Sequence, residues 1–274
     1  MVKSNLVLGI IGGGQLGSML ATAAKKIQIK TIILTEDPKA PAKNFCDEII
    51  ISEYDKLKII EDFASKVDIV TFEFENIPFK VLEYISKLKP VFPKPSINQI
   101  LQNRFTEKKF INNIGIKTTN YALIKNQSDI LNNEDLLPGL LKTCTLGYDG
   151  KGQFVLNNRE KASELGIRFN KEYILEKKVE LKKEISIIIT RFINNDFVIY
   201  EPVENLHINQ ILSKSTIPAE IDKVISEKAQ QQARVIAEKL DYVGTMCVEY
   251  FIDKKNNLFV NEIAPRVHNS GHLT

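Results

Sequence analysis

The alternation of apolar and amphipathic segments over the first hundred residues most constrains the fold. The runs "LVLGIIG", "TIILTE", "EIIIS" and "DIVTFEF" are predicted strands. Helical patterns separate them: "QLGSMLATAAKKI", a segment from about residue 55 to 67, and a segment after Pro78. Strands that alternate with helices predict a parallel sheet with helices on both faces, so residues 1–100 form a Rossmann-like α/β domain.

The pattern changes after "KPVFPKPS", which places a domain boundary near residue 100. A helix is expected over "INQILQNRFTEKKFINNIG", capped by Ser96 and ended by Gly115. Short strands and glycine turns over about 118–180 predict a small lid subdomain. Two long strands around "NND", a helix over 219–240 and two final strands follow. Residues 101–274 are therefore predicted as an α+β domain with antiparallel sheet.

Composition excludes several classes of protein. A net charge of +3 with scattered lysines gives no clustered basic face, so we expect no nucleic-acid partner. No apolar run approaches the length of a membrane span, and the N-terminus lacks the pattern of a signal peptide, so no membrane partner is expected. Three widely spaced cysteines predict reduced thiols and a cytoplasmic location.

The glycines of "GGGQLG" follow the first predicted strand and open a helix. Gly12, Gly14 and Gly17 have the spacing of a dinucleotide-binding turn, and Glu36 follows the second strand at the distance of a ribose partner. The motif predicts a nicotinamide dehydrogenase, a site for another phosphorylated ligand, or simply close packing of helix on strand. The motif alone leaves these three interpretations open.

A second glycine-rich stretch, "LLKTCTLGYDGKGQFVL", is more specific. Apolar flanks predict a hairpin whose loop runs from Gly147 to Gly152, with Lys142 on the preceding strand and Lys151 in the loop. Exposed backbone N–H groups and two ammonium groups suit a polyphosphate, and the glycines suit a closing lid. A plain surface hairpin is the alternative.

Two glutamates near the C-terminus are predicted to face each other. If the hairpin "CVEYFIDKKNNLFVNEI" turns between Lys255 and Asn256, Glu249 lies directly opposite Glu262. Like charges in that position destabilise a sheet unless a cation lies between them. With the amide of Asn261 they form the oxygen ligands that Mg²⁺ prefers. Two alternatives stay open. The register could be shifted by one residue, so that the glutamates face opposite sides, or the metal site could be zinc bound by His268 and His272.

Seven stretches together resemble the ATP-grasp superfamily and, within it, the N5-carboxyaminoimidazole ribonucleotide synthetase family. They are spread over the whole chain: "GIIGGGQLGSML", "VTFEFENIP", "RFTEKKF", "GYDGKGQ", "YILEKKVELKKEIS", "NLHINQIL" and "VNEIAPRVHNSGHLT". The resemblance implies an ATP-grasp fold behind a Rossmann-like pre-ATP-grasp domain. It also implies an ATP-dependent carboxylation of 5-aminoimidazole ribonucleotide by bicarbonate through carboxyphosphate, in purine biosynthesis.

The same resemblance implies the roles of individual residues. Arg266, Lys142 and His268 would be catalytic, with Arg266 holding bicarbonate, and Glu249 and Glu262 would bind two Mg²⁺ ions beside Asn261. The ATP-binding residues would be Arg104, Lys142, Gly147, Tyr148, Asp149, Gly150, Lys151, Gly152, Gln153, Glu176, Lys177, Lys178, Val179, Glu184, His207, Asn261 and Glu262. The ribonucleotide would contact Gly14, Gln15, Glu73, Glu75, Tyr148, Lys151, His268, Asn269 and Ser270.

Family resemblance further implies a homodimer that takes small-molecule substrates: ATP, bicarbonate and the ribonucleotide. Because the family continues beyond the position of Thr274, the chain is expected to be truncated relative to it. Two alternatives stay open at this point. One is an ATP-binding protein without full ligase activity, and the other is a different ATP-grasp carboxylate–amine ligase.

Overall fold

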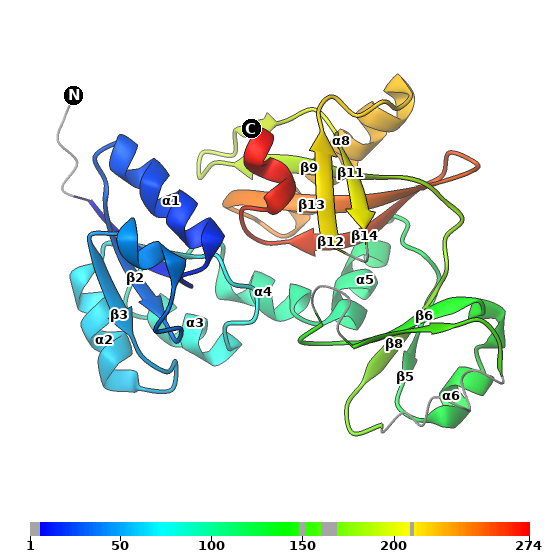
Figure 1. The fold of residues 1–274 in the computed structure, drawn as a ribbon, viewed down its shortest axis with the longest axis horizontal. Coiled ribbons are helices and arrows are strands. Elements are labelled where there is room, and N and C mark those ends of the chain that lie inside the picture. The colour runs from blue at the N-terminus through cyan, green and yellow to red at the C-terminus, as the bar shows by residue number, and fades with distance from the viewer. Residues whose placement is uncertain (1–5, 148–151, 160–168, 209–210) are drawn as a thin grey trace.

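The computed structural model describes residues 6–147, 152–159, 169–208 and 211–274. Figure 1 shows an N-terminal unit on one side, a large antiparallel sheet on the other, and a small sheet below it. Within the described ranges, no helix combines the length and the apolar character that crossing a membrane needs.

The N-terminal unit contains a parallel sheet with strand order β3-β2-β1-β4. Its elements are β1 (Val7–Ile11), α1 (Gln15–Lys26), β2 (Lys30–Thr35), β3 (Glu48–Ile51), α2 (Leu57–Lys66), β4 (Ile69–Phe72) and α3 (Phe79–Ser86). Successive residues of β1 point to opposite faces of the sheet. Ile11 packs with α2 and α3 on one face, and Ile10 packs with α1 on the other. Both faces are therefore covered, as the alternating pattern predicts.

One predicted helix is two helices in the structure. α4 (Pro95–Leu101) and α5 (Arg104–Asn113) are separated at Asn103, whose side chain accepts hydrogen bonds from the backbone N–H groups of Phe105 and Thr106. The Ser96 cap is also wrong, because α4 begins with Pro95 after an N-cap at Lys94. Gly115 ends the segment as predicted, with a φ of 78° that favours glycine.

The large sheet has strand order β12-β11-β9-β13-β14, and β10 pairs with the far end of β9. The strands are β9 (Leu181–Arg191), β10 (Phe197–Ile199), β11 (Val203–Ile208), β12 (Ile211–Thr216), β13 (Gly244–Asp253) and β14 (Leu258–Ala264). β10 is shorter than the long strand expected after "NND". The helix α8 (Lys223–Lys239) covers one face of this sheet and forms the largest apolar core with it.

A smaller sheet with order β5-β8-β6-β7 has a core of its own. It contains β5 (Tyr121–Ile124), β6 (Gly139–Thr143), β7 (Gln153–Leu156) and β8 (Tyr173–Lys177), with α6 (Gln127–Leu131) beside it. The expected hairpin of the second glycine stretch is present, because β6 pairs with β7 in antiparallel register from Gly139–Leu156 to Lys142–Gln153. Its strands hold Lys142 at the end that approaches the large sheet.

Truncation of the α8 core is expected to destabilise the protein. Ile236 on α8 is 0% exposed, so Ile236→Ala leaves a cavity and should lower the free energy of unfolding by about 2–5 kcal/mol. Val224 on the same helix is 74% exposed, and Val224→Ala should change stability by no more than about 0.5 kcal/mol. Urea unfolding followed by circular dichroism measures both; equal losses would contradict the assignment of the buried face.

Candidate active site

A cavity of about 610 Å³ lies between the large and small sheets and the N-terminal unit. That volume is typical of a small-molecule site. Half of the predicted site residues line it: Glu75, Arg104, Lys142, Gly147, Gln153, Glu184, His207, Glu249, Asn261, Glu262, Arg266, His268 and Asn269. Segments that are far apart in the sequence thus converge on one space.

The two glutamates face each other as predicted, but for a different reason. Glu249 on β13 pairs with Glu262 on β14, whereas the pairs nearer the turn, such as Ile252 with Leu258, show that the hairpin is centred on Lys255. The register shifts between Glu249 and Tyr250, where one extra residue is inserted in β14. The predicted turn centre is therefore wrong, and a β-bulge at Asn261 restores the pairing.

The paired carboxylates have opposite pKa shifts. Burial and the charge of Glu262 raise the pKa of Glu249 to about 8. Burial would also raise the pKa of Glu262, but the Arg104 guanidinium, whose Nη1 lies 2.9 Å from Glu262 Oε2, lowers it. Two like charges on neighbouring strands cannot both ionise freely without a cation nearby.

The donor set around these carboxylates fits Mg²⁺. Glu249 and Glu262 supply hard oxygen ligands, and Asn261, next to Glu262 on β14, lines the same cavity. A bound divalent cation would remove the repulsion that raises the pKa of Glu249. The chemistry of these side chains thus fits the predicted metal ligands.

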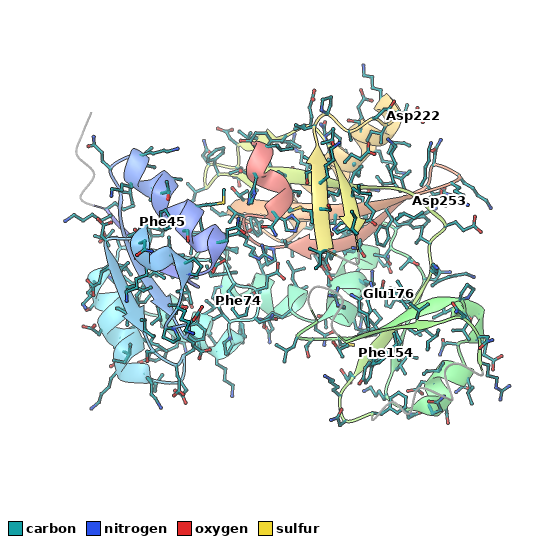
Figure 2. The ribbon with its side chains drawn as sticks, in the orientation of Figure 1. Phe45, Phe74, Phe154, Glu176, Asp222 and Asp253 are labelled. Atoms are coloured by element: carbon teal, nitrogen blue, oxygen red, sulfur yellow. The ribbon has the colours of Figure 1, made fainter. Side chains whose placement is uncertain are left out.

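A buried cluster of two lysines around one glutamate lies next to this pair. Glu176 Oε2 is 3.0 Å from Lys142 Nζ, and its Oε1 is 3.5 Å from Lys108 Nζ. Lys108 Nζ also donates to the backbone oxygen of Asn261, at 3.2 Å. Figure 2 shows Glu176 where the small sheet meets the rest of the molecule. The cluster therefore ties β6 and β8 of the small sheet to α5 and β14.

This cluster places two buried lysine side chains on one carboxylate. Burial would raise the pKa of Glu176, but Lys108 and Lys142 overcome that effect and lower it to about 2. Burial, together with the charges of Lys142 and Arg104, lowers the pKa of Lys108, although Glu176 and Glu107 oppose this shift. Such a cluster suits a phosphate.

Lys108 is a residue that sequence analysis missed. It is buried at 1% exposure, although lysine rarely is. A signal was present, because Lys108 follows the predicted ATP ligand Arg104 by four residues and Ile111 follows Lys108 by three. On a helix this spacing places all three on one face.

Both arginines of the cavity are paired with carboxylates. Arg104 contacts Glu262 and also donates to the backbone oxygen of Gly147, at 3.1 Å. Arg266 Nη2 lies 2.6 Å from Glu75 Oε1, and its Nη1 donates to the Val267 carbonyl. These pairs place Arg104 and Arg266 on the cavity wall, where each could exchange its carboxylate for a ligand anion.

On the opposite wall, His207 on β11 lies against Glu184 on β9. His207 Nδ1 is 2.7 Å from Glu184 Oε2, and this contact raises the pKa of His207. Both residues belong to the predicted ATP-binding set, and strand pairing between β9 and β11 brings them together.

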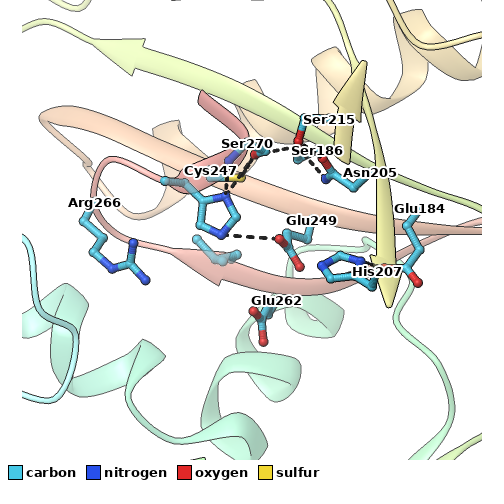
Figure 3. Close-up of polar contacts among 12 residues, drawn as sticks. Glu184, Ser186, Asn205, His207, Ser215, Cys247, Glu249, Glu262, Arg266 and Ser270 are labelled. Carbon is cyan, nitrogen blue, oxygen red and sulfur yellow. Dashed lines mark hydrogen bonds and ion pairs between the residues drawn. The ribbon is translucent and has the colours of Figure 1, made fainter. Parts of the chain in front are cut away.

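A chain of hydrogen bonds orients His268. Ser215 donates to Asn205, Asn205 to Ser186, and Ser186 to Ser270, whose hydroxyl lies 2.9 Å from His268 Nδ1 (Figure 3). The Ser270 N–H also points at Nδ1, at 3.2 Å. Each group in this chain donates a hydrogen bond to the next one, and Ser270, the last of them, donates to His268 Nδ1. Nδ1 is therefore an acceptor, and the imidazole proton lies on Nε2.

The orientation gives His268 a defined chemical character. Its Nε2 is 3.4 Å from Glu249 Oε1, and burial together with the charge of Arg266 lowers its pKa to about 4. His268 is therefore neutral at pH 7. Ser270, predicted to contact the ribonucleotide, is 0% exposed and lies behind His268, so its part in the site is indirect.

The carboxylate of Glu73, a residue outside the first glycine loop, lies against the backbone of that loop. Glu73 Oε1 accepts a hydrogen bond of 2.7 Å from the Gly14 N–H, and a Cβ at Gly12 would lie 2.7 Å from the same oxygen. Glu36, the expected ribose partner, accepts from the Tyr54 N–H instead. The N–H that would bind a dinucleotide phosphate is thus occupied, which argues against the dehydrogenase interpretation.

The backbone of residues 176–179, which belong to the predicted ATP-binding set and would contact the adenine base, is partly occupied by internal hydrogen bonds. The Lys177 N–H donates to Asn120, and its carbonyl accepts from Thr119 Oγ1. The Lys178 N–H donates to Pro138. The Lys178 carbonyl and the Val179 backbone are thus the groups left for hydrogen bonds to an adenine base. This reduces the set of backbone groups predicted to contact adenine.

The remaining predicted residues fall into two groups. Tyr148, Asp149, Gly150 and Lys151 lie outside the described residues. Those off the cavity lining are Gly14, Gln15, Glu73, Gly152, Glu176, Lys177, Lys178, Val179 and Ser270.

Comparison with family models identifies the class of protein. Residues 6–102 match the ribonucleotide synthetase preATP-grasp domain, and residues 109–274 match the ATP-grasp domain. The fold and the site therefore define an ATP-grasp enzyme, that is, an ATP-dependent ligase.

Individual relatives narrow this class. The chain is 39% identical over 277 residues to the N5-carboxyaminoimidazole ribonucleotide synthase of Staphylococcus aureus (strain COL) and 38% identical to that of Bacillus subtilis (strain 168). Each alignment covers 100% of this chain and 73% of the relative. The chain belongs to the N5-carboxyaminoimidazole ribonucleotide synthase family.

Solved structures agree with this assignment. An ADP complex of an N5-carboxyaminoimidazole ribonucleotide synthetase superposes with a TM-score of 0.94 at 40% identity, covering 100% of this chain and 74% of that one. The Aspergillus clavatus enzyme in complex with ADP and 5-aminoimidazole ribonucleotide gives 0.89 at 26% identity, covering 99% and 72%.

Removing the charge of Glu176 is expected to destabilise the protein strongly. Glu176→Gln leaves Lys108 and Lys142 buried without an anion, which should cost about 3 kcal/mol or more of unfolding free energy at pH 7. Urea unfolding measures the difference. The matched control is Glu172→Gln: Glu172 and its partner Lys125 are 48% and 59% exposed, so the change should stay below about 1 kcal/mol.

Acid should reduce this difference. The folded pKa of Glu176 is depressed to about 2 from an ordinary 4.5, so its stabilisation is fully present above the ordinary value and is lost as the pH falls toward the depressed one. The gap between wild type and Glu176→Gln should narrow from about pH 5 toward about pH 3. A gap that stays constant would show that the ionised carboxylate is not what stabilises the cluster.

Proposed function

We propose that this protein catalyses the ATP-dependent carboxylation of 5-aminoimidazole ribonucleotide by bicarbonate. ATP would phosphorylate bicarbonate to carboxyphosphate, and the amine would then be carboxylated, giving N5-carboxyaminoimidazole ribonucleotide, ADP and phosphate. The observation that carries the proposal is the pairing of Glu249 with Glu262 beside the buried lysines Lys108 and Lys142. Relatives that bear the name of this activity support it.

The charges of the cavity suit a reaction that gathers several anions. Lys142 and Arg104 would contact the phosphates of ATP, and Glu249, Glu262 and Asn261 would hold up to two Mg²⁺ ions. Bound Mg²⁺ would neutralise the charge that develops on the transferred phosphoryl group. Positioning and charge stabilisation then carry most of the rate enhancement.

Arg266 would bind bicarbonate, because its planar guanidinium matches a planar carboxylate. It would exchange Glu75 for this anion, and the freed Glu75 would face the ribonucleotide. His268, neutral and with its proton on Nε2, would donate a hydrogen bond rather than act as a cation. It would thereby orient a reacting oxygen without adding charge.

The other predicted roles follow from their positions. Glu184 and His207 would contact the ribose and phosphates of ATP, and the loop from Gly147 to Gln153 would close over them and exclude water from the labile acyl phosphate. Asn269 lines the cavity beside His268 and would contact the ribonucleotide. We further propose that the protein is cytoplasmic and forms a homodimer.

An assay of ADP release tests the reaction. Purified protein with Mg²⁺ and ATP should release ADP rapidly only when bicarbonate and 5-aminoimidazole ribonucleotide are both present, because the amine of the ribonucleotide is the acceptor of the carboxyl group. Turnover that is indifferent to the ribonucleotide would contradict the proposed acceptor. Binding of ATP in a calorimeter without turnover would favour an ATP-binding protein over a ligase.

Neutralising Glu262 should abolish turnover and preserve the fold. Glu262→Gln removes one of the two facing carboxylates, so ADP release should fall at least about a hundredfold through loss of metal-assisted charge stabilisation. Glu83→Gln, at an exposed position on α3, is the matched control and should retain full activity. Circular dichroism should be unchanged in both variants. If Glu262→Gln kept normal activity, the proposed role of the glutamate pair would be wrong.

A further inference from the structure

The Cys247 thiol lies beside the glutamate pair, and the proposed reaction does not use it. Cys247 and Glu249 are two residues apart on β13, so their side chains point to the same face of the sheet. His268, in the segment after β14, approaches both of them. One ligand atom from each of the three residues lies within 4.8 Å of the others (Figure 3). Sulfur, imidazole nitrogen and carboxylate oxygen thus lie close enough together to be candidate ligands of one ion.

The spacing of two of these atoms matches a tetrahedral metal site. His268 Nε2 and Glu249 Oε1 are 3.4 Å apart, which is long for a hydrogen bond. Two ligands of one tetrahedral zinc ion, each bound at about 2.0–2.1 Å, are separated by about 3.3 Å. An ion between them therefore requires little movement of either side chain.

Ser270 supplies the outer hydrogen bonds that such a site needs. Its Oγ lies 2.9 Å from His268 Nδ1 and 3.6 Å from Cys247 Sγ. A metal ion on Nε2 would move the imidazole proton to Nδ1, which would donate to the Ser270 hydroxyl, and the Ser270 N–H would give up its contact with Nδ1. That hydroxyl would in turn donate to the thiolate sulfur. Outer partners of this kind fix the ligating ring and stabilise the bound form.

We propose that Cys247, Glu249 and His268 bind a thiophilic divalent cation such as zinc. The thiolate selects zinc over magnesium, because soft sulfur ligands favour the softer ion. Binding releases the Cys247 thiol proton and the Glu249 carboxyl proton to solvent and involves no oxidation. Glu249 and His268 line the cavity and Cys247, 0% exposed, lies behind them, so the ion enters through the cavity. Because Glu249 is also a proposed Mg²⁺ ligand, zinc and the working magnesium exclude each other.

This zinc site differs from the one suggested by the two C-terminal histidines. His272 is exposed and does not belong to the cluster, whereas Cys247, predicted from sequence only as one of three reduced thiols, does.

Titration with Co²⁺ tests the site directly. Cobalt bound to a thiolate gives a charge-transfer absorption in the near ultraviolet, so the full-length protein should develop this band on titration. Cys247→Ala should lose it. Cys144→Ala is the matched control, since Cys144 is similarly buried at 2% exposure, and should keep it. A protein without the band, or a band that persists in Cys247→Ala, would overturn the proposal.

Two further measurements keep the result interpretable. Cys247→Ser changes a single atom and should fold normally by circular dichroism while losing the band, which separates loss of the ligand from loss of the fold. Adding Mg²⁺ should weaken the cobalt band, because both ions use Glu249; a band unaffected at saturating Mg²⁺ would contradict the shared carboxylate. None of these readouts depends on ligase activity.

Discussion

The repulsion between two carboxylates on neighbouring strands is the constraint on which the rest of the cavity depends. Glu249 and Glu262 face each other because a bulge at Asn261 shifts β14 by one residue. Their negative charge attracts cationic side chains from distant segments, above all Arg104 at the start of α5. The break between α4 and α5 matters for this reason, since a continuous helix would aim residue 104 differently.

The second constraint is the buried charge that joins the small sheet to the rest of the molecule. Glu176 comes from β8, Lys142 from β6 and Lys108 from α5. Apolar contacts hold each sheet together internally, whereas this polar cluster fixes how the two meet. A polar contact has a defined geometry, so it specifies the approach more narrowly than an apolar contact would.

Much of this arrangement could be predicted from sequence, because it follows from local periodicity. The parallel sheet and the hairpin that carries Lys142 rest on patterns of a few residues, whereas the facing glutamates were predicted from a turn centre that is wrong. The failures depend on features that hydrophobic periodicity does not show. The bulge at Asn261 leaves no mark in the alternation of "LFVNEIA", and the Asn103 cap competes with an uninterrupted helical pattern. Lys108 was overlooked because a lysine on a helix is ordinarily solvated, and only the packing of α5 against β14 buries it.

The glycine loop shows how far a local motif can mislead. Its spacing fits a phosphate, and the structure instead places Glu73 against the Gly14 N–H. The glycines are needed for that carboxylate, since a Cβ at Gly12 or Gly14 would crowd it. What the glycine motif binds is therefore decided by Glu73, the residue that follows β4, and not by the motif alone.

The ion pairs of the cavity have a consequence for how an anion would bind there. Arg104, Arg266, Lys108 and Lys142 each contact a carboxylate of the protein. A phosphate or bicarbonate that contacts Arg104 or Arg266 therefore replaces an internal partner rather than water, and association is an exchange of one anion for another. Dissolved salt weakens the internal pair and the new one together, so the two effects largely cancel. Affinity at this site should consequently depend far less on ionic strength than its number of cationic side chains suggests.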